Sequence, residues 1–459
     1  MLQSYTYRPK KALICSLIFF CFLLTVGCTD SKDPLAISKD DKVTLKVLCE
    51  SEKAFYSMYG ALFLSKFPNV DLQVVSMPMY LEDSPQDRKS KEIQFVETEQ
   101  PDLLILSEQQ FKDISSEGLL MDLDVLLKQE NDKEQLFSGI IPTITDYLRS
   151  IGAGKLYGLS SDFNSNALYF NKDLFDKAGV AYPEDYMNWE DVLLLAQRFN
   201  QNGNESFGLM VDNASTPFSV AIKVGLSKGL QYVDGSLKQI TISSKEWKHV
   251  FDIVLSAFKA NSIYKSSESD QLKPGMGYKD ILNLNPFISG KTAMVISGNY
   301  LVDQINDAKA YNKNNIFNWD IVTIPSDQRT INVQSYIWLN NVIAINSKAK
   351  NVNAAWQFMK YISSDEYAKI STVAKMNNSL PSRKEYLKDD EGHNFEAFYN
   401  LTIASNDLSW MEKLPQSFYT EFNRVGEEEI NKAYQGEESL DEALENLKVK
   451  GSQILVNTQ

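Results

Sequence analysis

The residue types of a catalytic site occur in few places in this sequence. The stretch "GLSKG", from Gly225 to Gly229, matches the G-x-S-x-G pattern of a hydrolase nucleophile elbow, in which Ser227 would be the nucleophile. An elbow needs a strand before the serine and a helix after it, but "LQYVDGSLKQITI" behind this serine predicts a turn and a strand. We therefore expect a helix that Gly225 closes, and no elbow.

The other patterns with catalytic residue types are weaker. "NPFISGKT" ends like a phosphate-binding P-loop, but Asn285 replaces its first glycine and the strand-like "KTAMVIS" follows it. Glu108 and Glu117 are a carboxylate pair of the kind that glycosidases place across a cleft, and only His249 and His393 are available as imidazole bases. No metal-binding motif is present, and we predict no metal and no cofactor. A surface hydrolase that uses Ser227 or a carboxylate pair remains an alternative.

A different chemistry is indicated by "SSDFNSN", residues 160–166, which is a polar run between two apolar, β-prone pieces of the stretch from Tyr157 to Val180. A hairpin would use a tight turn rich in glycine or Asn-Gly, and this run contains neither glycine nor proline. We infer that the chain binds something, or crosses between two parts of the fold, at this point.

The elements that must position these residues alternate between strands and helices. Strands are predicted at Val43–Cys49, in "VDLQVVSM" and in "PDLLILS", with the helix-like "AFYSMYGALFLSKF" after the first. Continuous apolar strands between helices predict an α/β protein whose sheet is largely parallel and covered on both faces. Helix starts are predicted at Asn188 in "NWEDVLLLAQRF", and at the capping boxes that begin with Ser363 and Ser439.

The N-terminus indicates export from the cytoplasm. Three basic residues precede the apolar run Ala12–Gly27, which has the length of a signal-peptide core and is short for a membrane-spanning helix. The run ends in "LTVGC", which resembles a bacterial lipobox with Cys28 as the lipidated (palmitate-bearing) residue, although Thr25 stands where leucine is usual. We predict a lipoprotein signal peptide at 1–27 and a flexible tether at 28–42; an uncleaved anchor helix and plain secretion are the alternatives.

Charge and cysteine content restrict the class of partner. The chain has 60 acidic and 46 basic residues, and loss of the signal peptide would take its net charge from −14 to −17 because only basic residues are removed. Such a chain does not favour binding to nucleic acid or anionic lipid. Of its four cysteines only Cys49 lies in the folded part, so the core must hold the fold without a disulfide. We also expect the folded protein to be a monomer.

Seven segments, in this order, resemble the family 1 extracellular solute-binding proteins of ABC transporters. The most specific part is "LYFNKDLFDKAGV" followed by a proline and then by "NWEDVLLLAQ". The likeness runs from about Val43 to the C-terminus. The segments are "PDLLILSEQQFKDISSEGLLMDL", "KLYGLSSDFNSNALYFNKDLFDKAGVAYP", "NWEDVLLLAQRF", "PFISGKTAMVISGNYLV", "NWDIVTIP", "NVIAINSKAKNVNAAWQFMKYISSDE" and "LPSRKEY".

This resemblance implies a periplasmic-binding-protein-like fold of two α/β lobes, joined by strands that cross between them, with ligand in the cleft and closure about a hinge. The N-lobe would be 43–162 with 342–376, and the C-lobe 163–341 with 377–459. "SSDFNSN" would then be the first crossing, and "SYIWLNN" and "MNNSLPSR" the other two. The missing proline after "YGL" and the bulky "SYIWLNN" depart from the family, so the ligand should not be taken over from any one relative.

The resemblance also implies a carbohydrate ligand, most often an oligosaccharide, and an ABC permease as the partner at the outer face of the cell membrane. A sensory subunit that presents ligand to a membrane kinase is the other alternative. The aromatic rings of Tyr300 and Trp338 suit sugar faces, and polar side chains of the crossings suit hydroxyl groups. The predicted ligand-binding residues are Glu52, Ser107, Gln109, Ser161, Asp162, Asn164, Asn299, Tyr300, Trp338 and Arg383.

Overall fold

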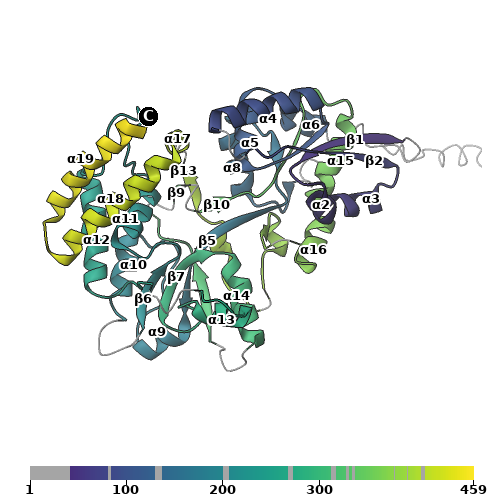
Figure 1. Ribbon diagram of the computed structural model, residues 1–459. Helices are drawn as coiled ribbons and strands as arrows, with labels where there is room; N and C mark the ends of the chain where they lie inside the picture. Colours follow the sequence, from purple (N-terminus) through teal and green to yellow (C-terminus); the bar gives the residue numbers. More distant parts are fainter. Residues whose placement is uncertain are drawn as a thin grey trace, which may run out of the picture.

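Two lobes, each built on its own β-sheet, make up the protein in a computed structural model (Figure 1). The structure describes residues 42–80, 84–129, 137–199, 206–266, 272–311, 317–326, 330–332, 336–376, 378–389, 391–404 and 409–458. The predicted signal peptide, Cys28 and nearly all of the predicted tether lie outside these residues. Among the described helices, none is long and apolar enough to span a membrane.

The first sheet has five strands in the order β2-β1-β3-β11-β4. Strand β1 is parallel to β2 and to β3, as the apolar runs predicted, whereas β11 returns late in the sequence and runs antiparallel to β3 and β4. The strands are β1 (Val43–Cys49), β2 (Val70–Ser76), β3 (Leu103–Leu106), β4 (Gly158–Leu159) and β11 (Val342–Ile345).

Helices cover both faces of this sheet (Figure 1). The predicted helix that follows β1 is present, but its middle turn is a π-helix, η2 (Tyr56–Gly60). The charged stretch after β2 contains a helix, α4 (Pro85–Glu99). The others are α2 (Glu52–Phe55), α3 (Ala61–Lys66), α5 (Glu108–Ser116), α6 (Leu123–Gln129), α8 (Pro142–Ile151), α15 (Val352–Ile362) and α16 (Asp365–Val373).

The second sheet is organised around the ten-residue strand β5 (Asp162–Asn171). Strands β7, β8, β10 and β12 all pair antiparallel with β5, and β6 pairs parallel with β7. The predicted strand in "KTAMVIS" is confirmed as β7. The strands are β6 (Phe207–Val211), β7 (Thr292–Gly298), β8 (Trp319–Val322), β10 (Ile337–Trp338) and β12 (Leu380–Pro381). Two further strands, β9 (Thr330–Asn332) and β13 (Thr402–Ala404), pair with each other.

Side chains of β5 alternate between two hydrophobic clusters, as the period of two along a strand requires. Tyr169 packs in a cluster that continues into the first lobe, whereas Leu168 and Phe170 pack in the cluster around Trp247.

The helices of this lobe are α9 (Lys172–Ala178), α10 (Trp189–Ala196), α11 (Pro217–Ser227), α12 (Lys245–Lys259), α13 (Tyr278–Leu284), α14 (Tyr300–Tyr311), α17 (Ser409–Glu412), α18 (Gln416–Gln435) and α19 (Leu440–Thr458); η5 (Lys384–Tyr386) and η6 (Phe395–Phe398) are 3₁₀ turns.

Two of the three predicted helix starts are confirmed and one is wrong by one residue. The Asn188 side chain caps α10, and Ser439 forms a capping box with Glu442 before α19. Helix α16 is capped by Ser364 and not by Ser363, because the Ser363 N–H bonds back to Met359 and closes the preceding helix α15.

Candidate functional site

The three predicted crossings lie side by side between the two sheets. Five of the residues of "SSDFNSN" belong to β5, which therefore begins at the hinge and is a strand from Asp162 onward. Trp338 of the second crossing pairs with Asn164, and Leu380 of the third pairs with Phe163. The polar run is thus explained by a strand that passes between lobes, as the fold prediction required.

Side-chain hydrogen bonds tie these crossings together. The Asn164 amide donates to Asn340 at 3.0 Å, and the Asn340 amide donates to Ser379 at 2.8 Å. The Asn299 amide oxygen accepts from the backbone N–H of Ser165 at 3.1 Å, and its nitrogen donates to the carbonyl of Asn378 at 2.8 Å. Asn164 and Asn299 are buried, so their amides hold the crossing segments in register.

A cavity of about 400 Å³ lies beside the crossings, on the C-lobe side. Its wall combines aromatic rings with polar and charged side chains, which is the usual composition of a small-molecule site. The lining residues are Asn166, Trp189, Val211, Asp212, Asn213, Lys223, Leu226, Ser227, Ile296, Tyr300, Ile324, Pro325 and Trp338. Tyr300 and Trp338 were predicted for the ligand site from sequence, and both line this cavity.

Tyr300 reaches the cavity because of the turn between β7 and α14. A Cβ atom on Gly298 would lie 2.6 Å from a carbon of the Tyr300 ring, so only glycine leaves room for the ring to fold back over the strand end. The Tyr300 hydroxyl donates to the Asp212 carboxylate. Each of the two rings, Tyr300 and Trp338, is 37% exposed, which leaves part of each ring available to a ligand.

Asp212 and Lys223 are polar members of this wall that the sequence reasoning missed. Asp212 follows β6 directly, at the carboxyl end of a strand parallel to β7, so the rule that placed Tyr300 could have found it. Its carboxylate also accepts from the Ser297 hydroxyl at 3.1 Å. Lys223 donates to the main-chain carbonyl of Asp212. Burial lowers the pKa of the Lys223 ammonium, and the nearby Asp212 carboxylate opposes that shift.

A second cavity, of about 620 Å³, lies at the carboxyl ends of β1, β2 and β3. The predicted residues Ser107 and Gln109 line it; Ser107 caps α5, and Gln109 donates to Asp113 at 3.1 Å. Glu50 lines it, whereas Glu52, the predicted residue, is exposed at the start of α2 and is not part of its wall. Lys413, from beyond α17, also lines this cavity, so its wall includes both predicted lobes.

The remaining predicted ligand residues lie elsewhere around the hinge. Asp162 and Asn299 line a third cavity, of about 220 Å³, which α14 and the end of α16 also border. The Ser161 hydroxyl donates to the Asp162 carboxylate at 2.9 Å. Arg383 is 7% exposed, donates to the Ser363 carbonyl at 2.7 Å, and lines none of these three cavities.

The side chains with catalytic potential have structural partners. The Ser227 hydroxyl accepts from the Trp189 indole and donates to the Val224 carbonyl, both at 2.7 Å, and Ser227 ends a helix instead of following a strand. His249 contacts Glu190 at 3.1 Å. Glu108 pairs with Lys112 and Glu117 with Lys89. Among the described residues, no group of three or more His, Cys, Asp or Glu could hold a metal ion.

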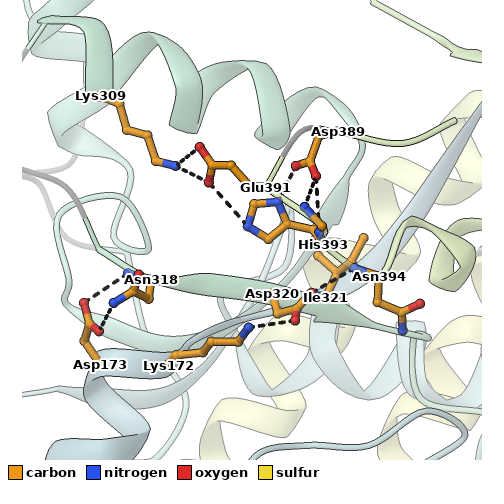
Figure 2. Close-up of polar contacts among 11 residues, drawn as sticks. Lys172, Asp173, Lys309, Asn318, Asp320, Ile321, Asp389, Glu391, His393 and Asn394 are labelled. Atoms are coloured by element: carbon orange, nitrogen blue, oxygen red, sulfur yellow. Dashed lines mark hydrogen bonds and ion pairs between the residues drawn. The ribbon is translucent and has the colours of Figure 1, made fainter. Parts of the chain in front are cut away.

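His393, for which the sequence predicted no specific role, contacts Asp389 and Glu391 of its own loop (Figure 2). Its ring stacks on Trp319 with centroids 3.8 Å apart and hydrogen bonds to Asp389. Burial opposes ionisation of Asp389, but the contact with His393 and two backbone N–H groups lower the pKa of that carboxyl. Glu391 of the same loop pairs with Lys309 of α14 at 2.8 Å.

Comparison with known proteins gives the family. The model of the bacterial extracellular solute-binding proteins matches residues 80–399. A binding protein of Brucella abortus is 23% identical over 77% of this chain and 79% of its own, and the arabinooligosaccharide-binding protein of Bacillus subtilis is 25% identical over 46% of each. The ABC substrate-binding protein of Listeria monocytogenes, solved in complex with cycloalternan, matches 91% of this chain and 100% of its own with a TM-score of 0.53 and 22% identity.

The match to the family model contains all residues that line the 400 Å³ cavity and all three crossings, but only part of the wall of the second cavity, whose residues Glu50 and Lys413 lie outside it. The members of this family are binding proteins and not enzymes. The chain therefore belongs to the bacterial extracellular solute-binding proteins.

Proposed function

We propose that this protein is a lipid-anchored receptor that captures an oligosaccharide between its lobes and delivers it to an ABC importer. The observation that carries the proposal is the wall of the 400 Å³ cavity, where two partly exposed rings, Tyr300 and Trp338, lie with Asp212, Lys223 and Asn166. Aromatic rings bind the apolar faces of sugars, and the polar groups bind their hydroxyls.

The second cavity supplies the opposite wall in this proposal. Lys413 lines it together with residues of the first lobe, so a ligand there would touch both sides of the cleft. Two-lobed proteins close around a ligand by hinge motion when ligand contacts favour the closed state. The solved Listeria relative was obtained with cycloalternan, which supports a saccharide as the ligand class here.

Transport rather than chemistry is the proposed outcome of binding. The hydroxyl of Ser227 already has a donor and an acceptor within 2.7 Å, so the proposal gives it no catalytic role. Attachment through Cys28 and handover to a permease are parts of this proposal that follow from the lipobox-like "LTVGC" and from the family.

Substitution of Tyr300 tests the proposed site. Tyr300→Ala should weaken saccharide binding by about 1 to 3 kcal/mol, roughly tenfold to a hundredfold in Kd, because apolar burial and ring contact are lost. Tyr300→Phe should lose much less, since the ring is kept. Isothermal titration calorimetry with a saccharide that binds the wild-type protein gives the Kd values.

Tyr311→Ala is the matched control, because Tyr311 ends the same helix, is 55% exposed and lines none of the three cavities. Its Kd should equal that of the wild type. Equal Kd values for Tyr300→Ala and the wild type would place the ligand elsewhere. If Tyr300→Ala instead lowers the free energy of unfolding of the ligand-free protein by a large amount, the ring belongs to the hydrophobic core.

A further inference from the structure

One cation in the wall of the 400 Å³ cavity, Lys223, forms no ion pair with the described residues, although the Asp212 carboxylate is near enough to influence its pKa. Lys223 is partly buried on α11, and its hydrogen bond is to the main-chain carbonyl of Asp212. No carboxylate oxygen of the described residues lies within the 4.0 Å of an ion pair from its ammonium. An ammonium that loses water without gaining an anion is in an unfavourable environment.

Three partly buried lysines elsewhere in the protein are paired with carboxylates, whereas partly buried Lys265 contacts the hydroxyl and ring of Tyr434. The side chains of Lys46, Lys172 and Lys228 are 24%, 32% and 18% exposed, and their ammonium groups lie 2.9, 2.8 and 3.4 Å from carboxylate oxygens. This fold therefore gives partly buried lysines a carboxylate partner at these three positions. Lys223 differs from them in lining a cavity that is open to a ligand.

Asp212 does not supply that partner in the observed geometry. One oxygen of its carboxylate accepts from the hydroxyls of both Tyr300 and Ser297, and the Lys223 ammonium bonds to the main-chain carbonyl of Asp212 and not to this carboxylate. Burial outweighs the attraction of Asp212 in setting the pKa of Lys223, and the net shift is downward. Closure of the first lobe over the cavity would remove more water and raise the free-energy cost of the unpaired cation.

We propose that the sugar unit bound in this cavity carries a carboxylate, as a uronic acid does, and that the Lys223 ammonium pairs with it. The inference rests on the proposed function and narrows its ligand to acidic saccharides. A carboxylate gives the ammonium a charge-assisted hydrogen bond, whereas a neutral sugar offers it only hydroxyl and ring oxygens. The Tyr300 and Trp338 rings remain available to the faces of the same sugar unit.

Pairs of ligands that differ only in the carboxylate test this proposal. Oligogalacturonides and oligoglucuronides are titrated in a calorimeter beside the same oligomers with each carboxyl reduced to a primary alcohol. In at least one pair the acidic form should bind with a Kd about tenfold to a hundredfold lower than that of the reduced form. This difference in affinity is the usual contribution of one hydrogen bond to a charged group.

Three variants assign the preference to Lys223. In Lys223→Met and Lys223→Gln, the two forms of the oligomer should bind equally, whereas Lys223→Arg should keep a preference for the acid because it keeps the charge. Lys228→Met is the matched control, because Lys228 lies just beyond the same helix, pairs with Glu190 and does not line the cavity. The melting temperature of each ligand-free variant shows that it folds.

The outcomes separate this inference from the proposed function. The proposed pairing of Lys223 with a ligand carboxylate is wrong if the neutral oligomers bind as tightly as the acidic ones or more tightly. It is also wrong if Lys223→Met and Lys223→Gln still prefer the acidic form. In both cases the proposed function as a saccharide receptor is not contradicted. If neither acidic nor neutral saccharides bind the wild-type protein, the proposed function fails and the inference fails with it.

Discussion

At the scale of single residues, the candidate site depends on side chains that the fold leaves partly exposed. Aromatic rings such as Tyr59, Phe163 and Trp247 are almost completely buried, whereas Tyr300 and Trp338 keep more than a third of their surface accessible. The Asp212 carboxylate holds the Tyr300 hydroxyl, which orients the ring at the cavity wall. A fixed ring loses less conformational freedom when ligand binds, and so contributes more to affinity.

The proposed lipid anchor at Cys28 can be tested directly. Cys28→Ser should abolish incorporation of labelled fatty acid and lipoprotein cleavage, because it removes the thiol that we propose to carry the lipid. The precursor would then be held by its apolar run or slowly shed. Since one acyl chain binds membranes only marginally, the proposed stable attachment would require several acyl chains. A Cys28→Ser protein that still incorporates labelled fatty acid would refute this assignment.

The sequence predicted only part of the candidate site. Tyr300 and Trp338 line the cavity because they lie at a strand end and at a crossing, which are positions that pattern and family resemblance reveal. Lys223 was missed although it is a single charge in the otherwise apolar "FSVAIKVGL", since helix spacing does not say which face meets a cavity. Four predicted ligand residues line none of the three cavities, and their ligand role stays a prediction: Glu52, Ser161, Asn164 and Arg383.

At the scale of elements, helix α11 positions Lys223 and Ser227 through close packing on α12. Gly225 allows this contact, because a Cβ atom there would lie 2.1 Å from the ring of Trp247. The motif "GLSKG" is thus a packing motif in this protein: its first glycine lies inside the helix, which continues to Ser227. The sequence predicted the helix correctly but closed it at Gly225, two residues early.

Gly225→Ala should destabilise the protein by about 1 to 3 kcal/mol, because the added methyl group overpacks the contact with Trp247. Urea unfolding measures the change. Gly235→Ala is the control, since a Cβ atom at Gly235 would have no neighbour within 4 Å; its effect should stay within about 0.5 kcal/mol. If both variants unfold at the wild-type midpoint, the close packing of α11 on α12 is not as described.

Strand and helix types were predicted better than their boundaries. Apolar runs identified β1, β2, β3 and β7, because buried strands have few polar residues. The polar start of β5 was not recognised as strand, since its hydrogen bonds go to β10 and β12, which come from far along the chain. Long-range pairing of this kind leaves no local pattern in the sequence.

At the scale of the whole molecule, the three crossings lie together as one hinge, and polar side chains form hydrogen bonds between them. Hydrogen bonds from Asn164 to Asn340 and from Asn340 to Ser379 join the three crossings to one another. The ammonium of Lys375, beyond α16, lies 3.2 Å from Asp303 of α14 and adds a contact between the lobes beside the third cavity. The two-lobed arrangement was predictable because the family resemblance supplied the connectivity that local patterns lack.

The central claim is that this protein binds a saccharide. Its melting temperature is measured with panels of monosaccharides, neutral and acidic oligosaccharides, polyols and peptides. A ligand at a hundred times its Kd adds about 2.7 kcal/mol to the free energy of unfolding, so at least one oligosaccharide should raise the melting temperature clearly. A melting temperature that no saccharide or polyol raises, or that only peptides raise, would contradict the claim.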